Sequence, residues 1–170
     1  ILAILLSLTM MFTLVPTAMA EGDEAPAGGE STPVETPAVK TTTGDVTYSD
    51  NDAKIENLVY TSGTMTVTGA NVTVENVTFG DGAALKVNTS GNFTLKDCTF
   101  NGKTDVRTPV TLNVGSATVT GNTFNGTKTD GTPTYYNAIE FAVSSGNKLS
   151  SATLSNNIFE AAIKIGRAHV

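Results

Sequence analysis

The chain is poor in cysteine and histidine, with one residue of each among its 170. A single thiol, Cys98, excludes an intrachain disulfide, and its place in the sequence pattern predicts a small buried hydrophobic side chain. The histidine, His169, belongs to the last six residues, IGRAHV, which look like the translation of a common sequencing adaptor. We therefore interpret 165–170 as an artefact, with a genuine exposed strand as the alternative. This interpretation leaves no histidine for acid–base catalysis or metal binding, and we expect no cofactor.

Basic residues are also scarce, since 10 Lys and Arg oppose 16 Asp and Glu, which gives a net charge of −6. Many of the acidic residues fall within 21–45, a stretch rich in Pro, Gly and Thr that cannot bury a hydrophobic core. We predict that 21–45 is a disordered acidic linker. The remaining chain is close to neutral, so we expect no nucleic-acid partner.

The one long apolar run lies at the N-terminus. Residues 1–20 carry no charge and end in Ala18-Met19-Ala20, the small-x-small pattern that precedes a signal-peptidase cut. A transmembrane anchor is the alternative, but the Pro16 break and the Ala-x-Ala end favour cleavage. The pattern predicts a signal peptide, export to the cell surface or medium, and membrane contact through this segment alone.

A sustained helical period is absent beyond residue 45, and a short motif recurs there instead. Its five copies are IENLVY at 55–60, VENVTF at 74–79, LKDCTF at 95–100, VTGNTF at 119–124 and LSNNIF at 154–159. Each begins with an aliphatic residue, has Asn, Asp or Gly at the third position and ends with an aromatic ring. A weaker motif falls between the copies: TMTV at 64–67, ALKV at 84–87, TLNV at 111–114, AIEF at 138–141 and AIKI at 162–165. Apolar and polar residues alternate in both motifs, which predicts half-buried strands.

The third position of the motif predicts a bend in every copy. Its occupants are residue types that tolerate positive φ, whereas a β-branched residue there would be strained by ~1–2 kcal/mol. These bend residues are Asn57, Asn76, Asp97, Gly121 and Asn156. One bend and three short strands per repeat predict a parallel β-solenoid.

With these motifs, the chain resembles the right-handed parallel β-helix proteins, whose enzymatic members include pectate lyases and polygalacturonases. The resemblance implies an all-β, right-handed parallel β-helix over 46–164, with about five coils of three short strands and a truncated C-terminal end. It indicates the fold and leaves the function open, because adhesins, surface proteins and polysaccharide enzymes share this fold.

Alternation assigns the faces of the predicted strands. The aromatic residues form one inward column, namely Tyr60, Phe79, Phe100, Phe124 and Phe159. The aliphatic residues that open the motif form a second: Ile55, Val74, Leu95, Val119 and Leu154. A third comprises Met65, Leu85, Leu112, Ile139 and Ile163. We expect all three columns to pack in the core rather than to meet a ligand.

Candidate ligand-binding residues fall on the outward side of the weaker motif and in two loops. The outward column is predicted as Thr66, Lys86, Asn113, Glu140 and Lys164, with Glu140 and Lys164 forming a cross-strand ion pair. The loops contribute Asp105, Arg107, Asp130, Tyr135 and Tyr136, whose polar groups and rings suit a sugar. A solvated loop without a ligand is the alternative interpretation.

The column holds one carboxylate, whereas a glycosidase needs two at ~5–9.5 Å and a lyase needs several for Ca²⁺. We therefore predict a non-catalytic extracellular module of a bacterial cell-surface protein, for adhesion, binding of polysaccharide or host glycan, or spacing. The alternatives are a polysaccharide lyase or glycoside hydrolase with its catalytic coils beyond the fragment, and a purely structural surface-layer stalk.

Overall fold

The computed structural model describes residues 39–102, 108–126, 137–142, 147–160 and 164–167. These ranges contain every copy of the main motif. The predicted signal peptide and residues 21–38 of the predicted linker lie outside them. So do the five loop residues singled out above, Asp105, Arg107, Asp130, Tyr135 and Tyr136, and one predicted core residue, Ile163.

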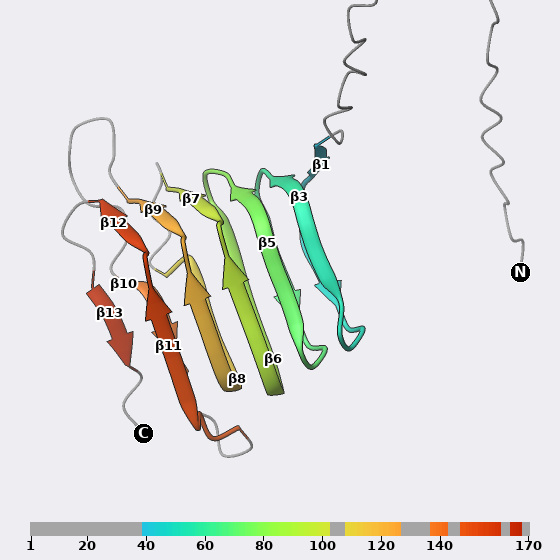
Figure 1. The fold of residues 1–170 in the computed structure, drawn as a ribbon. Coiled ribbons are helices and arrows are strands. Elements are labelled where there is room, and N and C mark those ends of the chain that lie inside the picture. Colours follow the sequence, from blue (N-terminus) through green and yellow to red (C-terminus); the bar gives the residue numbers. More distant parts are fainter. Residues whose placement is uncertain (1–38, 103–107, 127–136, 143–146, 161–163, 168–170) are drawn as a thin grey trace, which may run out of the picture. The chain divides into compact units, whose positions relative to one another are not determined.

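The described part of the chain is all-β, and its strands form one sheet of thirteen, with no helix among them. The strands are β1 (Lys40–Thr42), β2 (Val46–Tyr48), β3 (Lys54–Tyr60), β4 (Gly63–Val67), β5 (Val72–Phe79), β6 (Ala83–Lys96), β7 (Thr99–Asn101), β8 (Val110–Thr120), β9 (Thr123–Asn125), β10 (Asn137–Phe141), β11 (Ser151–Ser155), β12 (Ile158–Glu160) and β13 (Lys164–Arg167). Figure 1 shows β3, β5, β6, β8 and β11 side by side, following one another along the sequence. No stretch within the described ranges is a helix long and apolar enough to cross a membrane.

All strand pairs are parallel, and each strand pairs with the strand that carries the next copy of its motif. Thus β3 pairs with β5, β5 with β6, β6 with β8, and β8 with β11. The second predicted inward column is confirmed. Its members are successive partners, and all are buried except Leu154, which is half-buried: Ile55, Val74, Leu95, Val119 and Leu154. The repeated motif therefore sets the register of the sheet.

The predicted bends are confirmed at all five positions. The φ angles are 53° at Asn57, 52° at Asn76, 51° at Asp97, 70° at Gly121 and 55° at Asn156. Each bend occurs inside or just after the strand that opens its motif, so the aromatic end of the motif turns onto a new face. Short polar side chains and glycine relieve the steric clash that a Cβ-branched residue meets at such angles.

Two further series of positive-φ residues escaped the sequence interpretation. Asp52 and Asn71, both at 58°, precede β3 and β5. Gly44, Gly63 and Gly82 have φ of 81°, 92° and 76° and lie between β1 and β2, at the start of β4 and directly before β6. A Cβ on Gly63 would come within 2.6 Å of the Gly44 carbonyl carbon, so the close approach of successive corners also requires glycine there.

The aromatic column is confirmed and lies in the core. Its ring centroids are 5.8 Å apart between Tyr60 and Phe79 in an edge-to-face arrangement, and then 4.5, 4.9 and 5.0 Å apart in stacked pairs along the remaining three phenylalanines to Phe159. Tyr60, Phe79, Phe100 and Phe124 are fully buried, and Phe159 on the outer strand β12 is half-buried. Burial of each ring contributes roughly 1.5–3 kcal/mol.

The register predicted for the weaker motif was wrong in one repeat. Leu85 pairs with Val110 rather than with Leu112, which instead pairs with Val87. Val110 in turn pairs with Ile139. A shift of two residues keeps every side chain on its face, so hydrophobic alternation could not detect it.

The predicted boundaries also need adjustment at the N-terminal side. Strand β1 lies within the stretch assigned to the linker, and its Lys40 pairs with Leu58 of β3. The strand escaped prediction because its sequence, Lys-Thr-Thr, has no apolar residue to alternate. At the other side, β13 extends past residue 164 into the stretch interpreted as an artefact and pairs with β10.

Candidate functional site

The outward side of β4, β6, β8 and β10, together with β2 beside them, carries the candidate residues that the structure describes, except Lys164, which lies in β13. Successive partners along this face are Thr47, Thr66, Lys86, Thr111 and Glu140. We call these five residues the polar row. Lys86 is exposed and Glu140 half-buried, with the Thr111 strand between them. The row thus presents one cation, one carboxylate and three hydroxyls.

Asn113 and Lys164 do not belong to the polar row, contrary to the prediction. Asn113 pairs with Asn88, two residues further along the strands. Lys164 pairs with Asn137, and the partner of Glu140 is Gly166, so Glu140 and Lys164 are not directly opposite. The error at Asn113 follows from the two-residue shift described above, and the pairing of β10 with β13 contains an irregularity between Asn137 and Ile139.

Beside the polar row, Asn88 and Asn113 begin a ladder of side-chain amides. The Asn113 Nδ2 donates to the Asn88 Oδ1 at 2.8 Å, and the Asn147 Nδ2 donates to the same oxygen at 3.3 Å. Asn147 Nδ2 also donates to the main-chain oxygen of Asn113 at 3.3 Å. Amides can hydrogen-bond sugar hydroxyls, but these groups already satisfy part of one another's capacity.

The two predicted loops are represented by their described ends. Asn101, just before the first loop, pairs with Asn125, just before the second. Val110, just after the first loop, is the neighbour of Ile139, just after the second. The loops therefore leave from adjacent strands, β7 and β9, and return to adjacent strands, β8 and β10. Whether Asp105, Arg107, Asp130, Tyr135 and Tyr136 share one surface stays a prediction.

An ionic cluster on a different face was missed in the sequence. Lys54 Nζ lies 2.6 Å from a Glu56 carboxylate oxygen and 3.2 Å from one of Glu75. Lys96 Nζ lies 2.7 Å from the other Glu75 oxygen and 3.5 Å from Asp97. The sequence did hold a signal for the pair of Glu75 and Lys96, because both occupy the second position of the motif and are therefore direct partners on neighbouring strands.

The pairing shifts the pKa values of three of these groups. Hydrogen bonds from Lys96 first, and then from Lys54, lower the pKa of Glu75. Hydrogen bonds to Glu56 and Glu75 raise the pKa of Lys54, and the bond to Glu75 raises that of Lys96. Because the cluster is solvent-exposed and its pKa shifts favour the charged forms, we interpret it as a set of surface ion pairs rather than as an acid–base site.

The core contains a pair of asparagines that the sequence interpretation also missed. Asn122 is fully buried, and its Nδ2 donates to the main-chain oxygens of Leu95 and Thr120 at 3.1 and 3.0 Å. Its Oδ1 accepts from the Cys98 N–H at 2.9 Å, while the Asn157 Oδ1 accepts from both the Nδ2 and the main-chain N–H of Asn122 at 2.9 and 3.0 Å. Both asparagines directly follow a bend residue, a position that Leu58, Val77 and Cys98 occupy in the other repeats.

Cys98 lies in this column with its thiol buried, as predicted. Burial raises the pKa of the thiol to about 12. The sulfur donates to the main-chain oxygen of Lys96 at 3.2 Å. A thiol in this state is a poor nucleophile, because the reactive species is the thiolate.

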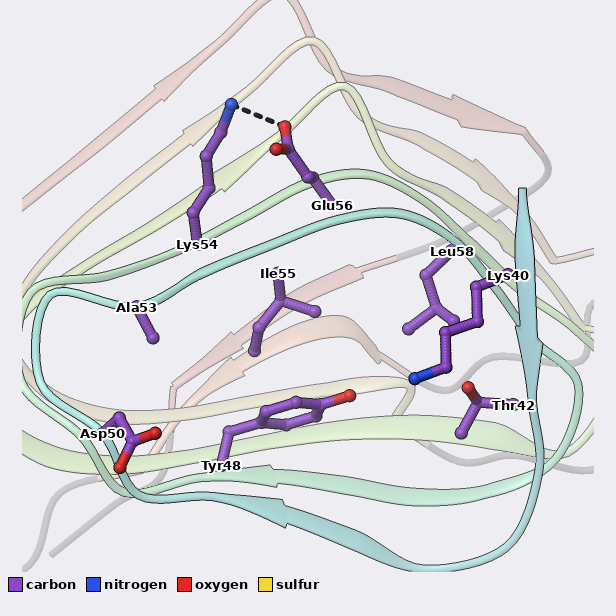
Figure 2. Close-up of a pocket in the computed structure, with 9 residues that line it drawn as sticks. All are labelled: Lys40, Thr42, Tyr48, Asp50, Ala53, Lys54, Ile55, Glu56 and Leu58. Carbon is purple, nitrogen blue, oxygen red and sulfur yellow. Dashed lines mark ion pairs between the residues drawn. The ribbon is translucent and has the colours of Figure 1, made fainter. Parts of the chain in front are cut away.

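A pocket of about 340 Å³ opens at the outer edge of the first strands. Ile55, Leu58 and Tyr48 supply its apolar lining, and Lys40 and Asp50 bring charges to it (Figure 2). The figure shows Lys54 and Glu56 joined by their ion pair on the far side of the strand from Ile55. The pocket lies at the exposed end of the hydrophobic core. Its lining holds two carboxylates, those of Asp50 and Glu56, and Figure 2 shows them on opposite sides of the strand that carries Lys54 and Glu56.

Within the ranges that the structure describes, no three His, Cys, Asp or Glu side chains are grouped so as to hold a metal ion. The arrangement of the polar row supports hydrogen bonding to a polar ligand, and its single carboxylate gives no acid–base pair. Comparisons of the chain with protein-family models, with curated proteins and with solved structures gave no match.

Proposed function

We propose that the parallel strands wind as a right-handed β-helix of about five coils with three short strands each, the solenoid that the motifs predict. Several observations support this. Partners in neighbouring strands are 19, 21, 24 and 35 residues apart in sequence as the chain advances. Positive-φ corners recur at equivalent positions, and the aromatic and aliphatic columns share the interior.

A pair of introduced cysteines tests this winding. Thr94 and Thr118 are direct partners on neighbouring strands, and their side chains alternate with buried ones. In a Thr94→Cys/Thr118→Cys variant, mild oxidation should give a rapid intrachain disulfide, because the Cα distance between neighbouring strands suits one. A Thr94→Cys/Thr123→Cys variant is the control and should not cross-link. Equal rates in the two variants would contradict the proposed coils.

We further propose that the chain is a non-catalytic extracellular module of a bacterial cell-surface protein, exported by residues 1–20 and used for adhesion, glycan binding or spacing. The observation that carries this proposal is the polar row. Its five outward side chains offer hydroxyls, one ammonium and one carboxylate on a face supported by a stacked core. Such groups can hydrogen-bond a polysaccharide or a cell-surface glycan without cleaving it.

The candidate ligand-binding residues are Lys86 and Glu140 in the polar row, Asn113 beside it, and the loop residues Asp105, Arg107, Asp130, Tyr135 and Tyr136. The loops join the sheet next to this face, since β8 and β10 follow them directly. Tyrosine rings can stack on the apolar faces of sugar rings while their hydroxyls form hydrogen bonds.

A purely structural stalk is the second candidate, and the amide ladders favour it. Asn76 donates to Asn57 at 2.7 Å, Asn71 to Asp52 at 3.0 Å, and Asn92 to Asn71 at 3.2 Å. These surface groups bind one another and stiffen the stack. The enzymatic alternative is a polysaccharide lyase or glycoside hydrolase whose catalytic coils lie beyond residue 164.

Binding of the purified chain to an array of bacterial and host glycans, and co-sedimentation with insoluble polysaccharides, test the proposal. Specific binding that falls at least several-fold in Lys86→Ala and in Tyr135→Ala/Tyr136→Ala would support the glycan site. Thr78→Ala, an outward residue on β5, is the matched control and should bind normally. The absence of any binding would favour the stalk, and binding unchanged in the tyrosine variant would remove the loops from the site.

A further inference from the structure

Two copies of the sequence Thr-Phe-Asn-Gly occur in the chain, at 99–102 and 123–126. Both asparagines end a three-residue strand, and the two are direct partners in the pairing of β7 with β9. Asn101 and Asn125 are half-buried, and the glycine after each is buried. Local sequence and secondary structure are therefore the same at both sites.

The hydrogen bonds at the two sites differ. The Gly102 N–H donates to the main-chain oxygen of Asn125 at 3.0 Å, which holds that nitrogen in the stack. No described residue accepts a hydrogen bond from the Gly126 N–H. The side chains are linked as well, because the Asn125 Nδ2 donates to the Asn101 Oδ1 at 2.8 Å. At the first site, both the Asn101 side-chain amide and the main-chain N–H of Gly102 are hydrogen-bonded. At the second site, the main-chain N–H of Gly126 has no hydrogen bond to a described residue.

We propose that Asn125 is a site of spontaneous deamidation and that the folded chain protects Asn101 from the same reaction. The deprotonated main-chain nitrogen of Gly126 attacks the Cγ of Asn125, a new N–C bond forms, and the side-chain nitrogen leaves with protons from water as ammonia. Water then opens the five-membered imide to aspartate or isoaspartate. Glycine favours the ring closure because it has no Cβ to obstruct it and permits the necessary backbone rotation.

The product would weaken the stack at a defined place. A carboxylate at 125 can no longer donate to the Asn101 Oδ1. Its partner on the other side is Glu160, which pairs with Asn125 between β9 and β12. Like charges directly opposite each other on parallel strands repel, so the modified chain should hold β12 less firmly.

Incubation of the full chain in mildly alkaline buffer, followed by peptide mapping with mass spectrometry, tests the proposal. Alkaline conditions speed the reaction because the attacking nitrogen must lose its proton. In the folded chain we expect conversion at Asn125 to be several-fold faster than at Asn101. In concentrated urea the two rates should become equal, since the local sequences are identical. Equal rates in the folded chain, or faster conversion at Asn101, would overturn the proposal.

The consequence for the stack has its own test. Asn125→Asp should lower the urea midpoint of unfolding, and Glu160→Gln in the same chain should restore part of the loss. If Glu160→Gln gives no restoration, the repulsion with Glu160 is refuted. The two tests are independent: the deamidation rates from peptide mapping test the modification of Asn125, and the urea midpoints test its effect on stability.

Discussion

The phenyl rings of Phe79 and Phe100 lie 5° from parallel with their centroids 4.5 Å apart. This separation is close to the spacing of neighbouring strands, so the backbone pairing and the ring stacking impose the same repeat. Phe100 and Phe124 continue the arrangement at 4.9 Å. The interior is thus a continuous stack in which each ring contacts the one before and the one after it.

Phe100→Ala should remove about 3–5 kcal/mol from the free energy of unfolding, because the surrounding rings cannot close the cavity. Urea unfolding followed by circular dichroism measures the loss. Thr99→Ala, the outward neighbour on the same strand, is the matched control and should change stability by less than about 0.5–1 kcal/mol. Similar values for the two variants would contradict the buried position of the ring.

Asn76→Val should destabilise the chain by about 1–2 kcal/mol through strain at the bend, where φ is 52°. The variant also loses the hydrogen bond from the Asn76 Nδ2 to the Asn57 Oδ1. Asn76→Gly separates the two effects, since glycine adopts positive φ freely but cannot make the hydrogen bond. Thermal unfolding should rank the variants with valine lowest, and a valine variant as stable as the glycine variant would refute the strain.

Asn122→Leu should cost at least about 2 kcal/mol, even though leucine occupies the equivalent position in the first repeat. The substitution leaves the Cys98 N–H and the main-chain oxygens of Leu95 and Thr120 without their present partner. Asn113→Ala, in the ladder at the surface, is the comparison and should cost less because water can replace its bonds. Chemical denaturation measures the free energy of unfolding of both variants. An equal loss in the two would show that the hydrogen bonds of Asn122 contribute no more than its volume does.

Stability should decline in acid in part through Glu75. Its pKa is lowered in the folded chain, so its contribution is present above the unfolded pKa and is lost as the pH falls through the folded one. Glu75→Gln should therefore flatten the decline in melting temperature between neutral and acidic pH. The pKa values of Lys54 and Lys96 are raised, so their contributions should be lost only at strongly alkaline pH. An unchanged acid profile in Glu75→Gln would show that the cluster contributes nothing.

Strand identity, bend positions and the two main columns could be predicted because a repeat constrains all of them at once. Asn76 and Asp97, for example, occupy the same position of the motif and have nearly the same φ angle, and they lie within and directly after the neighbouring strands β5 and β6. The register of Leu112 could not be predicted, because a two-residue slip preserves alternation. Strand β1 was missed since it lacks an apolar residue. The role of Asn122 was missed, because a buried asparagine can be explained only when the main-chain carbonyl groups that accept its hydrogen bonds are known.

For the candidate site, the outward placement of Lys86 and Glu140 followed from the alternation of apolar and polar residues. The ionic partners of Lys54 could not be predicted in this way, because they depend on the conformations of long side chains.

Sequence separation between partners grows from 19 residues to 35 along the chain, while the rows they form stay aligned. The additional residues lie in three places, between β7 and β8, between β9 and β10, and between β10 and β11. Much of the length variation thus falls at the first two junctions, where Asn101 and Asn125 mark the exits. Such a framework can accept foreign peptides at these exits without altering the layers above or below, which makes the junctions natural places to graft a recognition sequence.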